Sequence, residues 1–203
     1  RATRRHASVA TDLVSKSEIE TTQAIQSVVE GMSLSLYKFD YKSSSTKNKE
    51  DGVLKKVILA GSTSAAANSA ILKATAVVEG VVLARDLVNE PGGSLTPQVF
   101  ARKVTRMAKE KGLTVKVMDE TAIKKAGFGG LLGVNRGSDH PPRFVELTYR
   151  PKGKAKATLA LVGKGVTFDS GGLSIKPWQG MSEMKTDMGG AAAVVGAMSV
   201  LSS

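Results

Sequence analysis

Residues 159–198 contain most of the side chains in this sequence that could perform chemistry together. Between apolar and glycine-rich segments they carry, among their charged residues, Lys164, Asp169, Lys176, Lys185 and Asp187. Carboxylates are hard oxygen ligands that suit Mg²⁺, Mn²⁺ or Zn²⁺. A lysine beside them acts either as an ion-pair partner or, when a cation lowers its pKa, as a neutral amine ligand. Composition alone favours ordinary ion pairs. The apolar surroundings favour a metal site, because unpaired charge is costly there.

Other kinds of reactive site are disfavoured by the same residues. The sequence has no cysteine, which excludes a thiolate metal site and a cysteine nucleophile. Gly163-Lys164-Gly165 does not continue to a third glycine, since residue 168 is Phe, and no Walker loop is present. Ser170 lacks the Gly-X-Ser-X-Gly elbow of serine hydrolases. Phosphate binding and serine nucleophilic catalysis are therefore both disfavoured.

Regular elements are needed on both sides of this stretch to hold its charged residues in place. Residues 158–162 read as a buried strand that runs into the glycine-rich loop, and residues 188–201 read as a helix rich in small side chains. In open α/β sheets, ligands bind where the carboxyl ends of strands give way to loops. Gly171 and Gly172 allow the loop to turn tightly at that position.

The rest of the chain shows strand and helix patterns in alternation. We expect helices over 11–31, 64–88 and 96–111, with a short one between Asp119 and Gly127, and strands over 33–37, 53–60, 113–118 and 144–149. Thr96 followed by Pro97 is a favourable start for the third helix. This order predicts an α/β fold with a mainly parallel sheet sandwiched by helices.

Composition and charge limit the function only broadly. The 203 residues are 41% hydrophobic, and Lys+Arg minus Asp+Glu is 29 − 18 = +11. This basic balance permits an acidic protein, a membrane surface or nucleic acid as partner, but aromatic residues make up only 4%, which disfavours nucleic-acid binding. No apolar run reaches the roughly 18 residues that span a bilayer. The absence of cysteine and of N-glycosylation acceptors indicates an intracellular protein, in the cytoplasm or, given the Arg- and Ser-containing residues 1–10, in a plastid or mitochondrion.

Four segments together resemble a known family. VGKGVTFDSGGLSIKP, MKTDMGGAAAV, RDLVNEPGGSLTP and GFGGLLGVNRGS are similar to the leucine aminopeptidase (cytosol aminopeptidase) family, peptidase family M17. The resemblance implies a dinuclear metal-dependent aminopeptidase that releases N-terminal residues such as Leu from peptides and assembles as a homo-hexamer. It implies that residues 60–203 are the N-terminal part of the catalytic domain. Residues 1–59 would be the end of a preceding α/β domain and a linker.

The resemblance also assigns roles to individual residues. Lys164 and Asp187 would bind one metal ion, and Asp169 would bridge it to a second. Lys176 would be catalytic, polarising the scissile carbonyl and holding the developing oxyanion, and would contact substrate. Met184 would line the pocket for the first side chain of the substrate. The ions would be two divalent metals, namely Zn²⁺, with Mn²⁺, Mg²⁺ or Co²⁺ able to substitute.

One part of the family pattern is missing from this sequence. The family continues with a segment of the form Asn-Thr-Asp-Ala-Glu-Gly-Arg, which supplies further metal ligands, and these 203 residues do not contain it. We therefore expect the chain to be inactive alone. The alternative is a non-catalytic, aminopeptidase-like structural subunit of a larger assembly.

Overall fold

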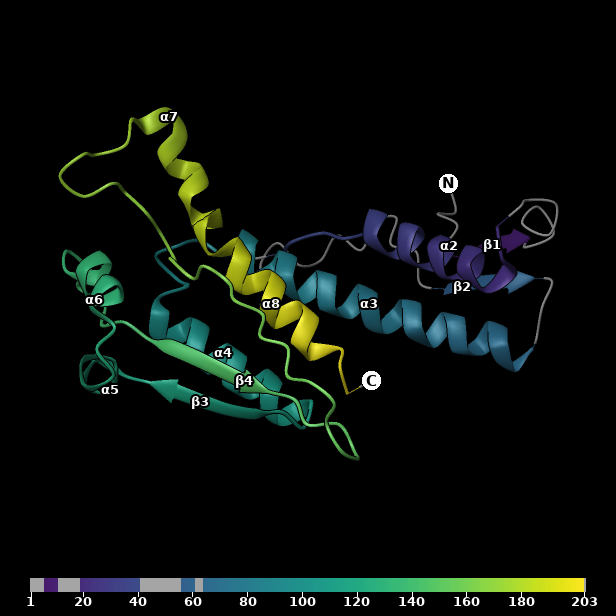
Figure 1. Ribbon diagram of the computed structural model, residues 1–203. Helices are drawn as coiled ribbons and strands as arrows, with labels where there is room; N and C mark the ends of the chain where they lie inside the picture. Colours follow the sequence, from purple (N-terminus) through teal and green to yellow (C-terminus); the bar gives the residue numbers. More distant parts are fainter. Residues whose placement is uncertain (1–5, 11–18, 41–55, 61–63, 203) are drawn as a thin grey trace. The chain divides into compact units, whose positions relative to one another are not determined.

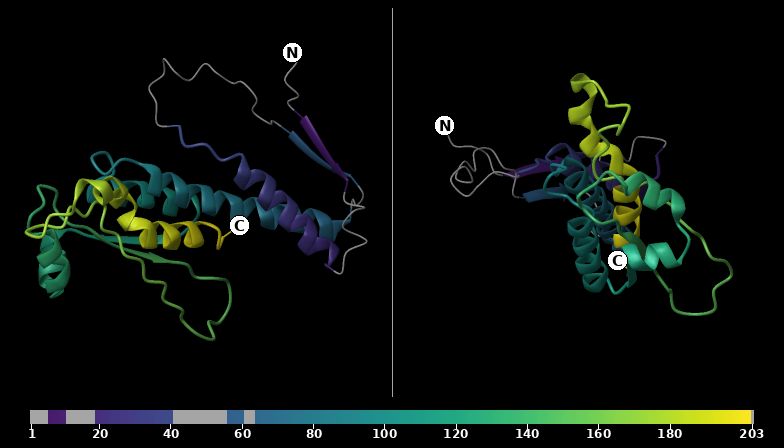
Figure 2. Two further views of the ribbon diagram at one scale, coloured as in Figure 1. Left: turned by 90° about the horizontal axis from the view of Figure 1, so that it is seen from above. Right: turned by 90° about the vertical axis from the view of Figure 1, so that its left-hand side faces the viewer.

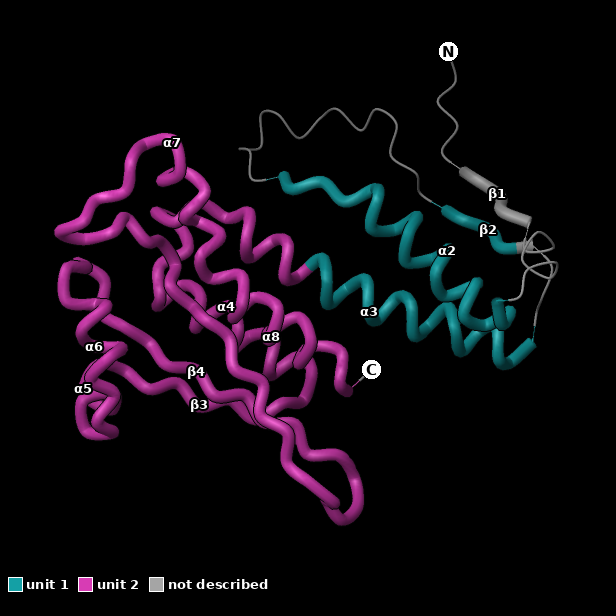
Figure 3. The backbone as a smooth tube through the Cα atoms, turned by 45° about the horizontal axis from the view of Figure 1, so that its top comes forward, with its two compact units in different colours: residues 1–82 teal, residues 83–203 magenta. Residues whose placement is uncertain are grey.

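The computed structural model describes residues 6–10, 19–40, 56–60 and 64–202 of the chain. The chain divides into two compact units, residues 1–82 and residues 83–203 (Figure 3). The long helix α3 (Ala65–Asn89) contributes residues to both units. None of the described helices is long and apolar enough to cross a membrane. The expected division of the chain into residues 1–59 and 60–203 stays a prediction.

The first unit contains a parallel strand pair and a small core. Its elements are β1 (His6–Ala10), α2 (Thr21–Ser35), β2 (Lys56–Ala60) and the first part of α3. β1 and β2 run parallel, with residue 6 opposite residue 56 and residue 10 opposite residue 60. The core consists of Ile25, Ala67 and Ala70, with Leu59 and Ile71 packed against them. Through this cluster, Ile25 of α2 packs on Ala67 and Ala70 of α3.

Two expectations for the first unit need correction. The strand predicted over 33–37 is wrong, because helix α2 continues to Ser35. Five alternating residues are too few to outweigh a helix that is already hydrogen-bonded. The strand predicted over 53–60 is confirmed from Lys56 onward, but Val57 and Ile58 are 38% and 47% exposed rather than buried. The first part of the helix predicted over 11–31 and residues 53–55 lie outside the described residues.

The second unit carries the larger core. Its elements after α3 are α4 (Pro97–Glu110), β3 (Thr114–Met118), α5 (Glu120–Lys125), α6 (Gly129–Asn135), β4 (Phe144–Thr148), α7 (Trp178–Met181), the 3₁₀ helix η2 (Ser182–Met188) and α8 (Gly189–Ser199). The predicted helix starts are confirmed. The Thr96 side chain accepts a hydrogen bond from the amide of Val99, and the Asp119 side chain accepts one from the amide of Ala122 at 2.9 Å.

Helix α4 holds the second unit together. It lies along the antiparallel pair β3–β4 and beside α8 (Figure 1). Its apolar face includes Val104 and Met107, which share one buried cluster with Leu113 before β3 and with Met188 and Val195 at α8. The element that follows the reactive loop is therefore packed on the same core as the sheet.

The buried strand predicted over 158–162 is wrong. No strand is present at this position, and Leu159, Leu161 and Val162 are 83%, 47% and 93% exposed. Before it, residues 150–158 form an exposed loop that extends away from the helices (Figure 2). A strand requires a hydrogen-bonded neighbour, and none of the described strands is hydrogen-bonded to this segment. The α/β class itself is confirmed, with one parallel and one antiparallel strand pair among the described residues.

Candidate metal centre

The reactive loop is held against the beginning of α8 by glycines. The amide of Ala191 donates a hydrogen bond to the carbonyl of Lys164 at 2.8 Å. A Cβ atom added to Gly163 would lie 2.4 Å from the carbonyl oxygen of Gly190, so only glycine fits there. A Cβ on Gly165 would lie 3.4 Å from that of Ala191. This close approach brings Lys164 next to the residues that immediately precede α8.

Lys164 and Asp187 form the first pair of the site. The Lys164 Nζ atom lies 2.5 Å from Oδ1 of Asp187, and the two side chains are 58% and 18% exposed. The other carboxylate oxygen of Asp187, Oδ2, is buried and has no hydrogen-bond partner in the structure. A buried acceptor without a partner costs free energy and calls for an explanation. A divalent cation bound at this oxygen would satisfy it, so the residues present fit a metal ion.

Asp169 and Lys176 form the second pair. The Lys176 Nζ atom lies 3.0 Å from Oδ2 of Asp169, and the amide of Gly171 donates to Oδ1 at 2.9 Å. The loop closes because the Lys176 amide donates to the carbonyl of Ser170. Gly171 has a φ of +98°, and a Cβ atom there would lie 2.2 Å from the carbonyl oxygen of Ser174. Glycine at this position therefore lets the loop fold back and place Lys176 on Asp169.

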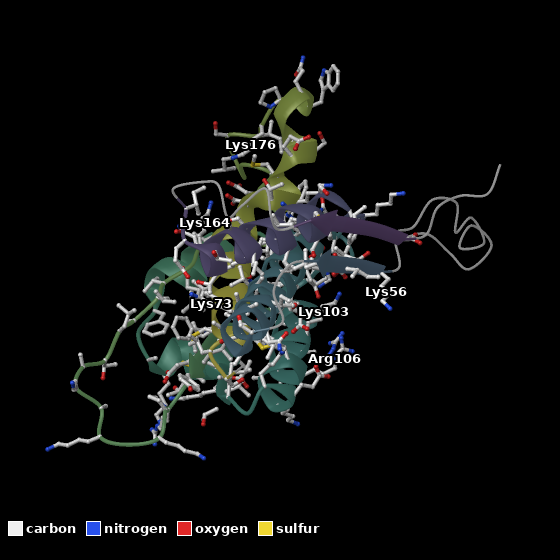
Figure 4. The ribbon with its side chains drawn as sticks, turned by 90° about the vertical axis from the view of Figure 1, so that its right-hand side faces the viewer. Lys56, Lys73, Lys103, Arg106, Lys164 and Lys176 are labelled. Atoms are coloured by element: carbon white, nitrogen blue, oxygen red, sulfur yellow. The ribbon has the colours of Figure 1, made fainter. Side chains whose placement is uncertain are left out.

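The two pairs form a single electrostatic cluster. The hydrogen bond from Lys176 lowers the pKa of the Asp169 carboxyl below its ordinary value, and the Gly171 amide and the positive charges of Lys176 and Lys164 lower it further. Lys164 therefore acts on Asp169 as well as on Asp187. Figure 4 shows the two lysines of the cluster. We call Lys164, Asp169, Lys176 and Asp187 the lysine–aspartate cluster.

Met184 lies on η2, three residues before Asp187, and its side chain is half-buried. In a 3₁₀ helix, residues three apart are on the same face. Met184 therefore shares a face with Asp187, which is compatible with a place beside the metal site. Its contact with substrate stays a prediction, as do the ligand roles of Lys164, Asp169 and Asp187 and the catalytic role of Lys176.

The donor set of the cluster is limited to these residues. Among the described parts of the chain, no group of three or more His, Cys, Asp or Glu side chains gathers in a way that could hold a metal ion. Two carboxylates and one amine can bind a divalent cation only when Lys164 gives up its proton and its ion pair with Asp187. In the structure the two lysines and the two aspartates pair one to one.

One contact at the site was not predicted from the sequence. The turn after α3 lies against Phe168, because a Cβ atom added to Gly92 would be 2.9 Å from the Phe168 ring. The sequence indicates only that residues 89–93 interrupt the helix. Gly92 and Phe168 are 76 positions apart, and a contact over that distance produces no local sequence pattern from which it could be predicted.

Comparison with known proteins identifies relatives along most of the chain. Residues 82–203 match the cytosol aminopeptidase family, catalytic domain. A probable cytosol aminopeptidase of Gluconobacter oxydans is 49% identical over 172 residues, which cover 84% of this chain and 34% of the relative. A probable cytosol aminopeptidase of Chlorobaculum tepidum is 45% identical and is matched over 93% of this chain and 39% of its own length.

Solved structures agree with this relationship. The bottromycin maturation enzyme BotP in complex with Mn has a TM-score of 0.84 and 40% identity, covering 99% of this chain and 41% of its own. The leucine aminopeptidase of Caenorhabditis elegans has a TM-score of 0.75 and 30% identity, covering 97% of this chain and 37% of its own. The chain thus spans well under half the length of these relatives. From its sequence and its fold, this chain belongs to the cytosol aminopeptidase family, whose catalytic domain it matches over residues 82–203.

Proposed function

We propose that this chain forms part of a dinuclear metal-dependent aminopeptidase that releases N-terminal residues of the Leu type from peptides. Membership of the family supports the reaction class. The observation that carries the site is the unpartnered, buried Oδ2 of Asp187 beside two lysine–aspartate pairs. An oxygen left without a donor in such a cluster is the position where a cation binds with the largest gain.

The ligands in this proposal are Lys164, Asp169 and Asp187. Asp169 would be a ligand shared by both ions, and Lys164 and Asp187 would hold one of them. Two bound divalent ions would supply Lewis acidity toward a peptide carbonyl and lower the pKa of a water molecule. Lys164 must be neutral to use its lone pair as a ligand. It must therefore lose its proton when Asp187, its present ion-pair partner, binds a metal ion.

Lys176 has the opposite requirement. Its ammonium group must stay protonated so that it can place a positive charge beside the oxyanion that develops on the substrate. One such donor is worth about 3–4 kcal/mol in the transition state. In the structure this ammonium rests on Asp169, which keeps it oriented toward the cluster. Met184 contributes an apolar wall for the substrate's first side chain.

The identity of the metals and the setting of the enzyme are part of the same proposal. We expect Zn²⁺, with Mn²⁺, Mg²⁺ or Co²⁺ able to replace it, and the Mn complex of BotP supports Mn²⁺ as one of these. The names of the cytosol aminopeptidase relatives support an intracellular enzyme. A homo-hexamer and a catalytic domain that begins near residue 60 also belong to the proposal. No observation on the described residues favours the alternative of a non-catalytic structural subunit.

Hydrolysis of leucine p-nitroanilide with Zn²⁺ or Mn²⁺ tests the function. The 203-residue chain is compared with a protein of the relatives' length that contains it. We expect the longer protein to be active, and its Lys176→Met variant to lose most of its kcat. Lys154→Met, in the exposed loop after β4, is the matched lysine control and should keep full activity. A longer protein that is folded, loaded with metal and inert would contradict the proposal.

A further inference from the structure

The turn that follows α3 lies directly against the residue before Asp169. A Cβ atom built on Gly92 would be 2.9 Å from Cδ2, 3.1 Å from Cβ and 3.2 Å from Cγ of Phe168. The shortest of these separations is below the distances that real Cβ atoms show, so the Phe168 side chain would have to shift to admit a methyl group at residue 92. A Cβ atom on the adjacent Gly93 would meet nothing within 4 Å. Neither glycine has a positive φ, so at Gly92 it is the lack of space that excludes a side chain.

The turn is fixed in place by a buried charge. Glu90 is only 6% exposed, and its carboxylate forms an ion pair with the ammonium of Lys103 on α4. The amides of Ser94 and Leu95 both donate to the carbonyl of Pro91, at 2.8 and 2.9 Å. A buried carboxylate that lost its partner would be strongly unfavourable, so the ion pair holds the turn in one position. The surface that Phe168 meets is therefore held by one ion pair and two backbone hydrogen bonds.

The loop that Phe168 belongs to needs such a support. Residues 163–176 contain no strand or helix, and Phe168 itself is 42% exposed. The loop is attached to α8 through the carbonyl of Lys164 and closes on itself beyond Asp169. Phe168 lies between these two attachments. Because Asp169 follows it directly in the chain, a shift of the Phe168 backbone would displace Asp169 as well.

We propose that the turn at residues 90–93 positions Asp169 through Phe168. Gly92 and the Glu90–Lys103 ion pair are positioning groups, since none of them has a contact with Asp169 among the interactions that the structure describes. The turn sets where the carboxylate stands relative to Lys176 and to Asp187. The part of this inference that concerns metal binding rests on the proposed function. The placement of Asp169 does not, because it is measurable in the metal-free protein.

The test compares Gly92→Ala with Gly93→Ala, two substitutions of the same chemistry at neighbouring positions. In the metal-free chain, the ¹⁵N–¹H signal of Gly171 reports on Asp169, because this amide donates to its carboxylate. We expect Gly92→Ala to shift this signal and speed its hydrogen exchange, while Gly93→Ala leaves both unchanged. Far-ultraviolet circular dichroism confirms that both variants are folded. An unchanged Gly171 signal in folded Gly92→Ala would overturn the inference.

Mn²⁺ binding, followed by electron paramagnetic resonance, extends the test to the metal site. Changes around metal ligands typically weaken metal affinity about 10- to 100-fold, and we expect a loss of this size for Gly92→Ala alone. The loss should nearly vanish when Phe168→Ala is the background, because Ala at 92 then finds space. Equal losses in both backgrounds would show that Gly92 acts by another route. If neither the parent chain nor Gly93→Ala binds Mn²⁺, the metal proposal fails, while the Gly171 signal still decides the positioning.

Discussion

Replacing Asp187 by alanine should make the metal-free chain slightly more stable while removing its response to metal. Three contributions determine the change in the free energy of unfolding. The buried oxygen without a partner costs about 1–3 kcal/mol, which the substitution recovers. The ion pair with Lys164 is exposed on the lysine side and contributes about 0–1 kcal/mol. The Asp187 carboxylate, two residues before α8, also stabilises the folded state by about 0.3–1 kcal/mol through the helix dipole, and the substitution removes this contribution.

The balance of these terms is a gain of about 1 kcal/mol for Asp187→Ala in the absence of metal. In a chain of this size that corresponds to a rise in Tm of about 2–4 °C. Urea unfolding in the presence of EDTA measures it. Asp169→Ala is the matched control, because both oxygens of Asp169 have hydrogen-bond partners and no gain is available. Its stability should stay the same or fall.

Adding metal should reverse the order of the variants. A ligand that binds only the folded state at 100 times its Kd stabilises that state by about 2.7 kcal/mol. The parent chain should show this gain with Zn²⁺, and Asp187→Ala should show none. The reasoning is refuted if Asp187→Ala is less stable than the parent by about 1 kcal/mol or more in EDTA and is still stabilised by Zn²⁺. The Oδ2 atom would then neither destabilise the metal-free fold nor act as a metal ligand.

Three further predictions concern the ion pairs and the loop. Lys103→Met leaves the buried carboxylate of Glu90 unpaired and should lower the free energy of unfolding by about 1–3 kcal/mol, measured by urea denaturation. The pKa of Asp169 should lie below 3.8 in a ¹³C NMR titration and rise in Lys176→Met, since the hydrogen bond from Lys176 is the largest cause of the lowering. Because this pKa is depressed by folding, its contribution to stability is present above the unfolded pKa and is lost as pH falls through the folded one. Gly163→Ala should weaken both the fold and Zn²⁺ binding, because its Cβ would lie 2.4 Å from a carbonyl at the start of α8.

Each of these has a control within the chain. Lys109→Met, on the exposed side of α4, should change stability by less than about 0.5 kcal/mol. Gly133→Ala, inside α6 with nothing within 4 Å of the new Cβ, should stabilise by up to about 1 kcal/mol. A Lys103→Met variant as stable as Lys109→Met, an Asp169 pKa at its ordinary value, or a Gly163→Ala variant that behaves like Gly133→Ala would each contradict the corresponding contact.

The elements that the sequence predicts correctly are those whose signals are local. Thr96 and Asp119 are expected to begin helices, and both accept the expected backbone hydrogen bonds. The failed strand over 158–162 involves a signal that depends on distant partners. Residues 158–162 have strand-like composition, yet a strand forms only beside a hydrogen-bonded neighbour, and the structure describes none there.

The candidate site shows the same division. Residue types and their spacing indicate only the charged stretch, and the family resemblance of its motifs singles out Lys164, Asp169, Lys176 and Asp187 within it. Which lysine pairs with which aspartate could not be predicted from the sequence. The pairing depends on the glycines that allow the loop to approach the start of α8 and to fold back on itself. The contact between Gly92 and Phe168 is equally hidden, since the packing of a turn on a ring follows from tertiary structure alone.

Anomalous diffraction from crystals grown with Zn²⁺ tests the central claim most directly. The claim is that the lysine–aspartate cluster binds divalent metal. It predicts an anomalous peak about 2.0–2.2 Å from Oδ2 of Asp187, with the Lys164 amine turned from its ion pair toward the same ion. Crystals at saturating Zn²⁺ that keep both lysine–aspartate ion pairs, and show no anomalous density between Asp169 and Asp187, would contradict it.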